Sequence, residues 1–152
     1  MRILPIRQAN NASDGTAVGM AESIVAAVDG GATVINISAS SFFPTAALEA
    51  AVDYATAKDV LIVTGASNEA KSGNPKAYPA AYPPVVAVGA IGPEGARTEF
   101  SETGEFLSVV APGQDIAGLS RTGRGHVQDS GTSYAAPFVA GSPPSCAATT
   151  PS

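Results

Sequence analysis

The stretch that decides the fold reads Gly131-Thr132-Ser133-Tyr134-Ala135-Ala136-Pro137-Phe138-Val139-Ala140-Gly141. Gly131 allows a close backbone approach, and Thr132 and Ser133 are residue types that commonly start helices. The apolar run that follows predicts a buried helix, and we place Pro137 in its first turn, where a missing N–H costs no hydrogen bond. Ser133 then lies at the positive end of a helix, where unpaired backbone N–H groups can hold a developing oxyanion.

A serine hydroxyl needs a base before it can act as a nucleophile, and this base is normally a histidine held by a carboxylate. The chain has one histidine, His126, seven residues before Ser133. It lies in a short segment that we expect to lead into Gly131 as a strand or turn, so we predict a surface or substrate-side position for it rather than the role of general base. The catalytic set is therefore incomplete, and an ordinary capped helix is the alternative interpretation of the serine stretch.

Outward from this stretch, the chain alternates helical and strand-like segments. Apolar residues at helical spacing predict helices over 16–28 and 45–58. Almost continuously apolar, β-branched runs predict buried strands. The predicted strands cover 33–38, 60–64 and 85–91, with shorter ones over 3–8, 107–110 and 116–119. Such alternation predicts an α/β fold of three layers, in which a mostly parallel sheet carries helices on both faces.

Composition narrows the class of protein. The chain has 152 residues, of which 45% are hydrophobic, enough for the core of one domain. Only 14% are charged, and the net charge of −5 with no cluster of Lys and Arg argues against nucleic-acid binding. Cys146 is the only cysteine, which excludes an internal disulfide and zinc-type spacing. No cofactor is expected.

The ends of the chain show no targeting signal. No apolar run is long enough to span a membrane, and the first residues lack the apolar core of a signal peptide. We therefore expect a cytoplasmic location for the chain as written. The residues from 142 to 152 are Pro, Ser, Thr, Ala and one Cys without periodicity, which predicts a disordered tail after a domain over 1–141.

The serine stretch resembles the nucleophile motif of subtilisin-like serine proteases. The segment from Val60 to Glu69 is similar to the family strand that ends in the oxyanion-hole asparagine, here Asn68, although Ser67 stands where the family normally has glycine. The segment from Val34 to Ser40 resembles the strand that lines the substrate cleft. Further family-like segments, which we interpret as scaffold, are 78–90, 100–104 and 110–116.

The resemblance implies a serine endopeptidase that cleaves polypeptide substrates. It implies that Ser133 is the nucleophile and that Asn68 donates to the oxyanion. The residues that it places against the substrate are Ser38, Ala39, Ser40, Gly65, Ala66, Ser67 and Thr132. Some members of the family bind calcium, but the sequence offers no clear cluster of carboxylate ligands for it.

Two family segments have no counterpart in the sequence. The aspartate string and the His-Gly-Thr string that complete the catalytic triad are both missing. Within the family, the strings over 6–8 and 31–38 look most like the mycosins, membrane-anchored proteases of type VII secretion systems. We therefore expect an incomplete fold, the carboxy-terminal part of a catalytic domain. Such a chain should be marginally folded and inactive alone, with a complementing fragment as a possible partner.

Two alternatives to an active protease remain. The chain could be a catalytically dead remnant that still binds peptides in its cleft. It could also be an unrelated α/β ligand-binding domain, although no Gly-x-Gly-x-x-Gly or Walker-type loop follows any of the predicted strands.

Overall fold

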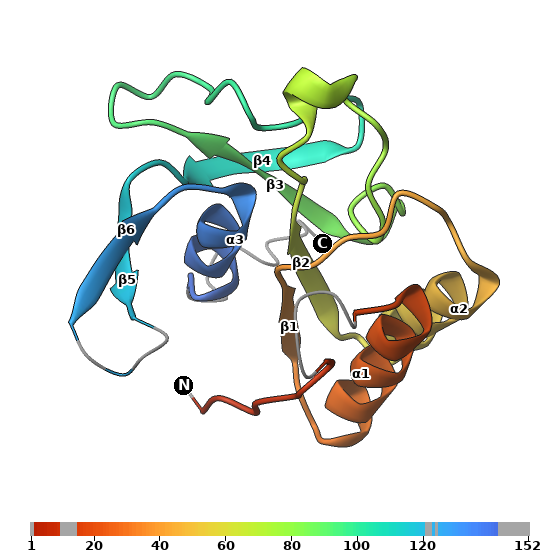
Figure 1. The fold of residues 1–152 in the computed structure, drawn as a ribbon. Coiled ribbons are helices and arrows are strands. Elements are labelled where there is room, and N and C mark those ends of the chain that lie inside the picture. Colours follow the sequence, from red (N-terminus) through yellow and green to blue (C-terminus); the bar gives the residue numbers. More distant parts are fainter. Residues whose placement is uncertain (1, 10–14, 121–122, 124, 143–152) are drawn as a thin grey trace, which may run out of the picture.

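The computed structural model describes residues 2–9, 15–120, 123 and 125–142 (Figure 1). The predicted tail, apart from Ser142, lies outside the described residues. The helices are α1 (Ala17–Asp29), α2 (Ala46–Ala57) and α3 (Thr132–Ala140), with a short 3-10 helix η1 (Ala70–Ser72). The strands are β1 (Val34–Ile37), β2 (Leu61–Gly65), β3 (Val86–Ile91), β4 (Leu107–Pro112), β5 (Ile116–Leu119) and β6 (His126–Asp129).

The main sheet is parallel, as the sequence predicts. Its strand order is β1-β2-β3-β4, with Ile35 opposite Ile62 and Val63 opposite Val86. Strand β4 joins β3 in parallel after a register shift at the start of the pair. Strands β5 and β6 form a separate antiparallel hairpin, which leads the chain into α3 (Figure 1).

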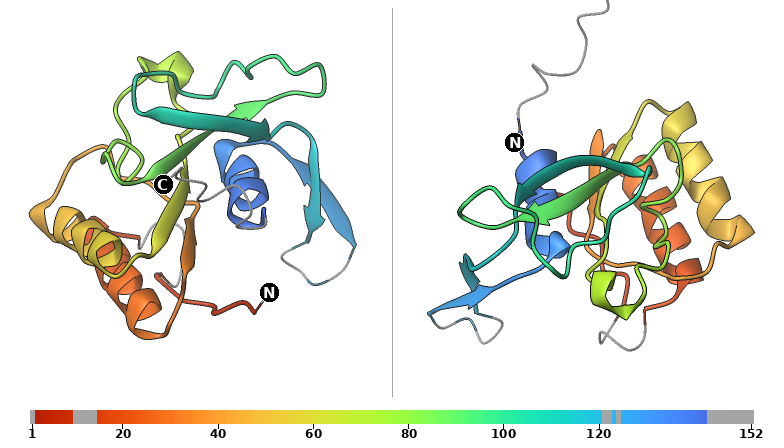
Figure 2. Two further views of the ribbon diagram at one scale, coloured as in Figure 1. Left: turned by 180° about the vertical axis from the view of Figure 1, so that it is seen from behind. Right: turned by 90° about the horizontal axis from the view of Figure 1, so that it is seen from above.

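Helices cover both faces of the sheet, so the prediction of three layers is confirmed (Figures 1 and 2). Consecutive residues of a strand point to opposite faces, and Ile62 and Val63 belong accordingly to two different cores. The Ile62 core includes residues of α1 and α2, whereas the Val63 core includes Ala135 and Ala136 of α3. The small side chains of α3 let the helix lie close to the sheet, which matters for the site below.

The two long helices begin where threonine side chains cap them. Thr16 accepts a hydrogen bond from the N–H of Gly19 at 3.0 Å, and Thr45 accepts one from Leu48 at 3.2 Å. These caps satisfy N–H groups that have no partner within the helix. The helices predicted over 16–28 and 45–58 are thus confirmed to within one residue at each end.

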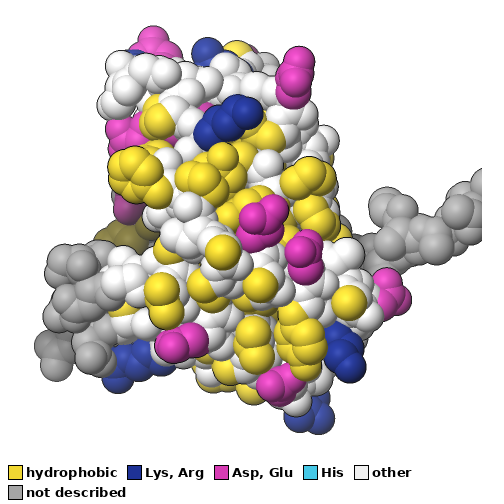
Figure 3. Space-filling view, turned by 90° about the vertical axis from the view of Figure 1, so that its right-hand side faces the viewer, with side chains coloured by type: hydrophobic (Ala, Val, Ile, Leu, Met, Phe, Trp, Pro, Cys, Tyr) yellow, Lys and Arg dark blue, Asp and Glu magenta, His cyan; other side chains and the backbone are white. Residues whose placement is uncertain are grey.

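The outer face of α1 and α2 is mixed in character. Figure 3 views the molecule from this side, and hydrophobic side chains alternate there with acidic and basic ones. Val18 and Val25 are among the exposed hydrophobic residues of α1. No helix of the described residues is long and apolar enough to cross a lipid bilayer.

Two local predictions are wrong. Residues 2–9 form neither helix nor strand, because no described strand lies beside them and Pro5 has no N–H to donate to a ladder. Pro137 is the sixth residue of α3, not part of its first turn. The helix also keeps an open side, since Phe138 is 50% exposed. The carbonyl that Pro137 leaves without a helical donor is that of Ser133, four residues earlier.

Candidate active site

The carboxyl end of β2 runs directly into the loop that carries Asn68. Gly65 is the last residue of β2, and Ala66 and Ser67 continue from it as buried residues. Ser67 has a φ of 88°, a left-handed conformation that favours glycine. This backbone turn exposes Asn68. Ser67 stands where the family normally has glycine, and the left-handed conformation strains the serine at this position.

The first residue of α3 packs onto this turn. A Cβ atom on Gly65 would lie 2.7 Å from Thr132 Oγ1 and 2.9 Å from the Thr132 backbone, so only glycine permits the approach. Thr132 Oγ1 accepts a hydrogen bond from the N–H of Ser67 at 3.2 Å. In return, the N–H of Thr132 donates to Asn68 Oδ1 at 2.8 Å. Asn68 therefore caps α3 from a loop that is 64 residues away in sequence.

The orientation of Asn68 is fixed by this hydrogen bond. Its Oδ1 is occupied by Thr132, whereas its Nδ2 donates to no other described residue. A Cβ atom on Gly131 would lie 3.3 Å from Nδ2, so the absence of a side chain there leaves that group uncrowded. The amide is a donor held at the amino terminus of α3, beside Ser133.

Ser133 is half-buried as the second residue of α3. The N–H groups of a first helical turn have no carbonyl partners within the helix. Thr132 and Tyr134 find theirs in Asn68 and in the carbonyl of Gly131, and the N–H of Ser133 donates to no described residue. A free N–H and the helix dipole both favour negative charge next to the Ser133 hydroxyl.

The end of β1 reaches the same place. Ser38 follows β1, and its hydroxyl donates to the backbone carbonyl of Ser133 at 3.1 Å. Ser38, Ala39 and Ser40 are all exposed. They line one side of a hollow of about 410 Å³. Its other lining residues are Gln8, Ala9, Gly15, Thr16, Ala17, Met20 and Ser41. Carboxyl ends of parallel strands are where α/β sheets commonly bind ligands.

Direct contacts join six of the nine sequence-predicted site residues. Thr132 contacts Gly65, Ser67 and Asn68, and Ser38 contacts Ser133. Ala66 lies inside the β2 turn, and Ala39 and Ser40 lie along the hollow.

His126 does not join this group. It is the first residue of β6, exposed and paired with Leu119, whereas Asp129 at the other end of β6 bonds to the hydroxyl of Tyr134 at 2.8 Å. Three residue steps of a strand span about 10 Å, which separates His126 from the start of α3. The structure therefore supports the prediction that His126 is not the general base.

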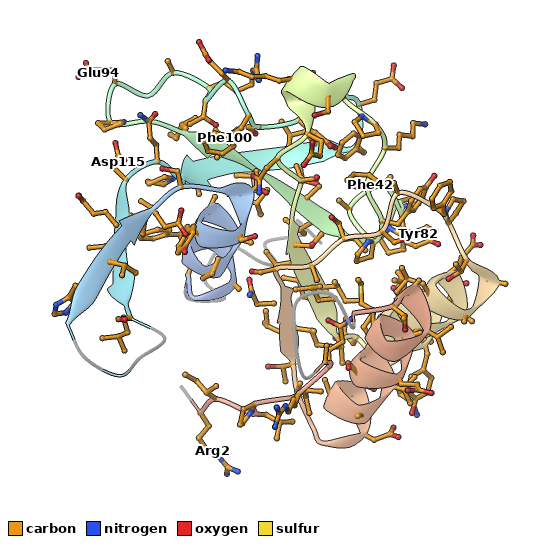
Figure 4. The ribbon with its side chains drawn as sticks, viewed as in Figure 1. Arg2, Phe42, Tyr82, Glu94, Phe100 and Asp115 are labelled. Atoms are coloured by element: carbon orange, nitrogen blue, oxygen red, sulfur yellow. The ribbon has the colours of Figure 1, made fainter. Side chains whose placement is uncertain are left out.

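One buried polar residue near the site was not singled out from the sequence. Glu102 is fully buried, and neither of its carboxyl oxygens has a hydrogen-bond partner among the described residues. Burial raises the pKa of Glu102 above its ordinary value. Phe100, two residues before it in the chain, packs against the α3 side of the sheet (Figure 4). The sequence gives no signal of this burial, because the residues on both sides of Glu102, Ser101 and Thr103, are polar.

The described residues contain no group of three His, Cys, Asp or Glu side chains that could hold a metal ion.

Residues 1–143 match the model of the Subtilase family. The chain is 41% identical over 140 residues to "Thermophilic serine proteinase" of Bacillus sp. (strain AK1), an alignment that covers 92% of this chain and 34% of that protein. It is 36% identical over 138 residues to "Subtilisin DY" of Bacillus licheniformis, which covers 90% of this chain and 50% of that protein.

The fold of the chain is also similar to that of solved protease structures. The self-cleaved protease domain of PatA aligns with a TM-score of 0.81 and 34% identity, over 90% of this chain and 53% of that chain. The prenylagaramide maturation protease PagA aligns with a TM-score of 0.77 and 32% identity, over 84% of this chain and 48% of that chain. The chain thus spans between about a third and a half of the length of these relatives.

Proposed function

Because the chain belongs to the subtilase family of subtilisin-like serine proteases, we propose that it carries the nucleophile and the oxyanion hole of a serine endopeptidase. The observation that supports this most directly is the hydrogen bond from the N–H of Thr132 to Asn68 Oδ1. This hydrogen bond occupies the oxygen of the Asn68 amide and leaves its Nδ2 available as a donor beside Ser133. A nucleophile and an oxyanion donor then share one helix terminus.

The proposed reaction is acyl transfer. Ser133 Oγ attacks the carbonyl carbon of a peptide bond, and its proton passes to a base. The carbonyl oxygen takes the negative charge and accepts hydrogen bonds from Asn68 Nδ2 and from the N–H of Ser133. The protonated base then gives its proton to the leaving amine, and water later releases the acyl group from Ser133.

The substrate proposed is an extended polypeptide. The exposed segment over Ser38–Ser40 and the β2 end over Gly65–Ser67 flank the serine. An extended backbone can bind to the exposed segment by main-chain hydrogen bonds, whereas the backbone groups of Ser67 are already bonded to Thr132 and Glu102. The hollow beside Ser38 would take a substrate side chain. Thr132 contributes indirectly, because it holds the β2 end against α3.

We propose that the base and its carboxylate come from a polypeptide segment outside these 152 residues. His126 lies at the far end of β6, so it does not supply the base. The chain alone is then inactive, and a segment with the missing aspartate and histidine would complement it. The second candidate is a peptide-binding remnant without catalysis, which is favoured because no base lies near Ser133 among the described residues.

A fluorophosphonate label tests these candidates. The purified chain, the Ser133→Ala variant and the chain mixed with the unmatched part of the thermophilic relative are labelled side by side. The proposal expects weak labelling of the chain alone, strong labelling of Ser133 after mixing, and none in Ser133→Ala. Strong labelling of the chain alone would contradict an external base. Peptide binding without labelling in the mixture would favour the remnant.

For the subtype and location we propose a mycosin-like protease of the cell envelope, from the strings over 6–8 and 31–38. Genomic sequence on both sides of this reading frame tests it. Segments for the aspartate, the histidine and a membrane anchor would support the subtype, and coding sequence for an unrelated protein would contradict it.

A further inference from the structure

The loop that carries Asn68 is attached to a second segment of the chain. The N–H of Ala70 donates to the carbonyl of Phe100 at 3.2 Å, and the N–H of Glu102 donates to the carbonyl of Ser67 at 3.3 Å. Farther along, the Asn74 side chain accepts from the N–H of Thr103 at 2.9 Å and donates to its carbonyl at 2.7 Å. Backbone and side-chain hydrogen bonds therefore join the loop to residues 100–103.

The Glu102 carboxyl is enclosed between these two segments. Its side chain has no exposed area, and no described group forms a hydrogen bond to either oxygen. An ionised carboxylate without partners is very unfavourable inside a protein, whereas a neutral carboxyl costs far less. The structure as it stands thus accommodates Glu102 in its protonated form.

Among the residues that the structure describes, no positive charge compensates Glu102. Glu69 faces it from the Asn68 loop, and its negative charge opposes ionisation of Glu102. Lys71 is paired with Glu99 on the surface. Arg97 is directed to backbone carbonyls of its own segment, those of Thr98 at 3.0 Å and Ser101 at 2.6 Å.

We propose that Glu102 is a positioning residue whose protonation state controls the Ser67–Asn68 turn. In the neutral form the carboxyl stays buried and the turn holds Asn68 against Thr132. When Glu102 releases its proton to solvent, the carboxylate draws hydrogen bonds from the Ser67 hydroxyl and the N–H of Glu69. Both groups favour the ionised carboxyl and act to lower the pKa of Glu102, although burial outweighs them.

This movement would change the direction of the Asn68 amide. Ser67 is already held at a φ of 88°, so its turn has little conformational freedom to absorb a shift of its side chain. The next residue is Asn68, which would carry the change to its contact with Thr132. The inference rests on the proposed function only for the meaning of Asn68 in catalysis, since the coupling itself is a property of the fold.

An NMR titration of the whole chain tests the inference without any assay of activity. The carboxyl carbon of Glu102 and the side-chain amide of Asn68 are followed from acid to neutral pH. We expect Glu102 to titrate above the ordinary range of glutamate, and the Asn68 amide to shift with the same midpoint. Glu102→Gln, which resembles the neutral form, should abolish the Asn68 shift. The control is Glu105→Gln, an exposed acid of the same segment, which should preserve it.

A second variant keeps the test decisive if Glu102→Gln fails to fold. Glu69→Gln removes the facing charge, so the Glu102 and Asn68 midpoints should both move down together. An ordinary glutamate midpoint for Glu102 in the folded chain would overturn the inference. So would an Asn68 amide signal that does not change during the titration. The two proposals can fail separately. If Glu102 and Asn68 titrate together but Ser133 is not labelled after complementation, the proposed function is refuted and this inference stands.

Discussion

The Ser38 hydroxyl donates to the carbonyl of Ser133, a contact between residues 95 positions apart. In an uninterrupted helix that carbonyl would accept from the N–H of residue 137, but Pro137 has none. The proline thus frees an acceptor on the proposed nucleophile, and the end of β1 uses it. This contact attaches α3 to the strand that lines the proposed substrate site.

A double-mutant cycle measures this contact. Ser38→Ala should lower the free energy of unfolding by about 0.5–1 kcal/mol, the usual net value of a hydrogen bond. In a Pro137→Ala background the new N–H of residue 137 can satisfy the same carbonyl, so the cost of Ser38→Ala should fall. Urea unfolding of the four proteins gives the coupling energy. Equal costs in both backgrounds would show that Pro137 does not govern the contact.

Gly65→Ala should disrupt the packing between β2 and α3. The added methyl group would lie 2.7–2.9 Å from Thr132, including its backbone, so the helix must shift. We expect a loss of about 2 kcal/mol, the range for overpacked interiors. The matched control is Gly118→Ala in β5, where the nearest atom would be 4.0 Å away and the change should be small. Similar urea midpoints for both variants would contradict the argument.

Ser67→Gly should stabilise the chain. Glycine relieves the strain of a left-handed residue, about 1–2 kcal/mol, but loses about 0.5–1 kcal/mol of chain entropy. The net gain is about 0.5–1 kcal/mol. Thermal unfolding against Ser67→Ala, which keeps the strained φ, separates the backbone effect from loss of the hydroxyl. If alanine stabilises as much as glycine, the strain is not the cause.

Substitutions of Asn68 should affect the stability of the chain and its catalytic turnover differently. Asn68→Asp keeps an oxygen for the N–H of Thr132 and adds a charge that suits a helix amino terminus, so the chain should stay stable. It removes the Nδ2 donor. In the complemented enzyme we expect a loss of turnover of about 10²–10³-fold, the magnitude known from a subtilisin, a relative of this chain. Asn68→Ala should lose both turnover and about 1 kcal/mol of stability. Full turnover in Asn68→Asp would exclude the oxyanion role.

Tyr134→Phe should raise the pKa of Asp129. The Tyr134 hydroxyl and then the N–H of Ser130 hold that pKa below its ordinary value. The stabilisation from a lowered pKa is present above the ordinary pKa and is lost as the pH falls through the lowered one. The two proteins should therefore converge in stability in acid. NMR of the Asp129 carboxyl carbon reports the shift, with Tyr54→Phe, whose hydroxyl bonds to Asp29, as control.

The sequence predicts the sheet well because its strands are buried on both faces. Residues such as Ile62 and Val63 must both be apolar when each face packs against helices, and such runs stand out from the rest of the chain. The segment around Pro5 is apolar too, but a strand exists only where a neighbour pairs with it. Pairing depends on tertiary structure, so local pattern alone gave the wrong prediction there.

Only those residues of the site that lie within recognisable motifs could be predicted from the sequence. The strings around Asn68 and Ser133 indicate the two residues, but not that Asn68 bonds to Thr132 rather than to Ser133. The burial of Glu102 depends on loops that fold over it from elsewhere in the chain. In the sequence, Glu102 is a single acidic residue between polar ones, and nothing in this local pattern predicts that it is buried.

The strand order leaves β1 and β4 as the two borders of the main sheet within the described residues. Both borders carry exposed valines, Val34 on β1 and Val109 and Val110 on β4. If the β1 border of one copy met the β4 border of another, each pairing would leave a fresh border at both ends. A head-to-tail contact of this kind closes into a ring where the rotation between copies allows it and otherwise continues as a filament. In concentrated solution the chain should therefore associate head to tail, into assemblies larger than a dimer.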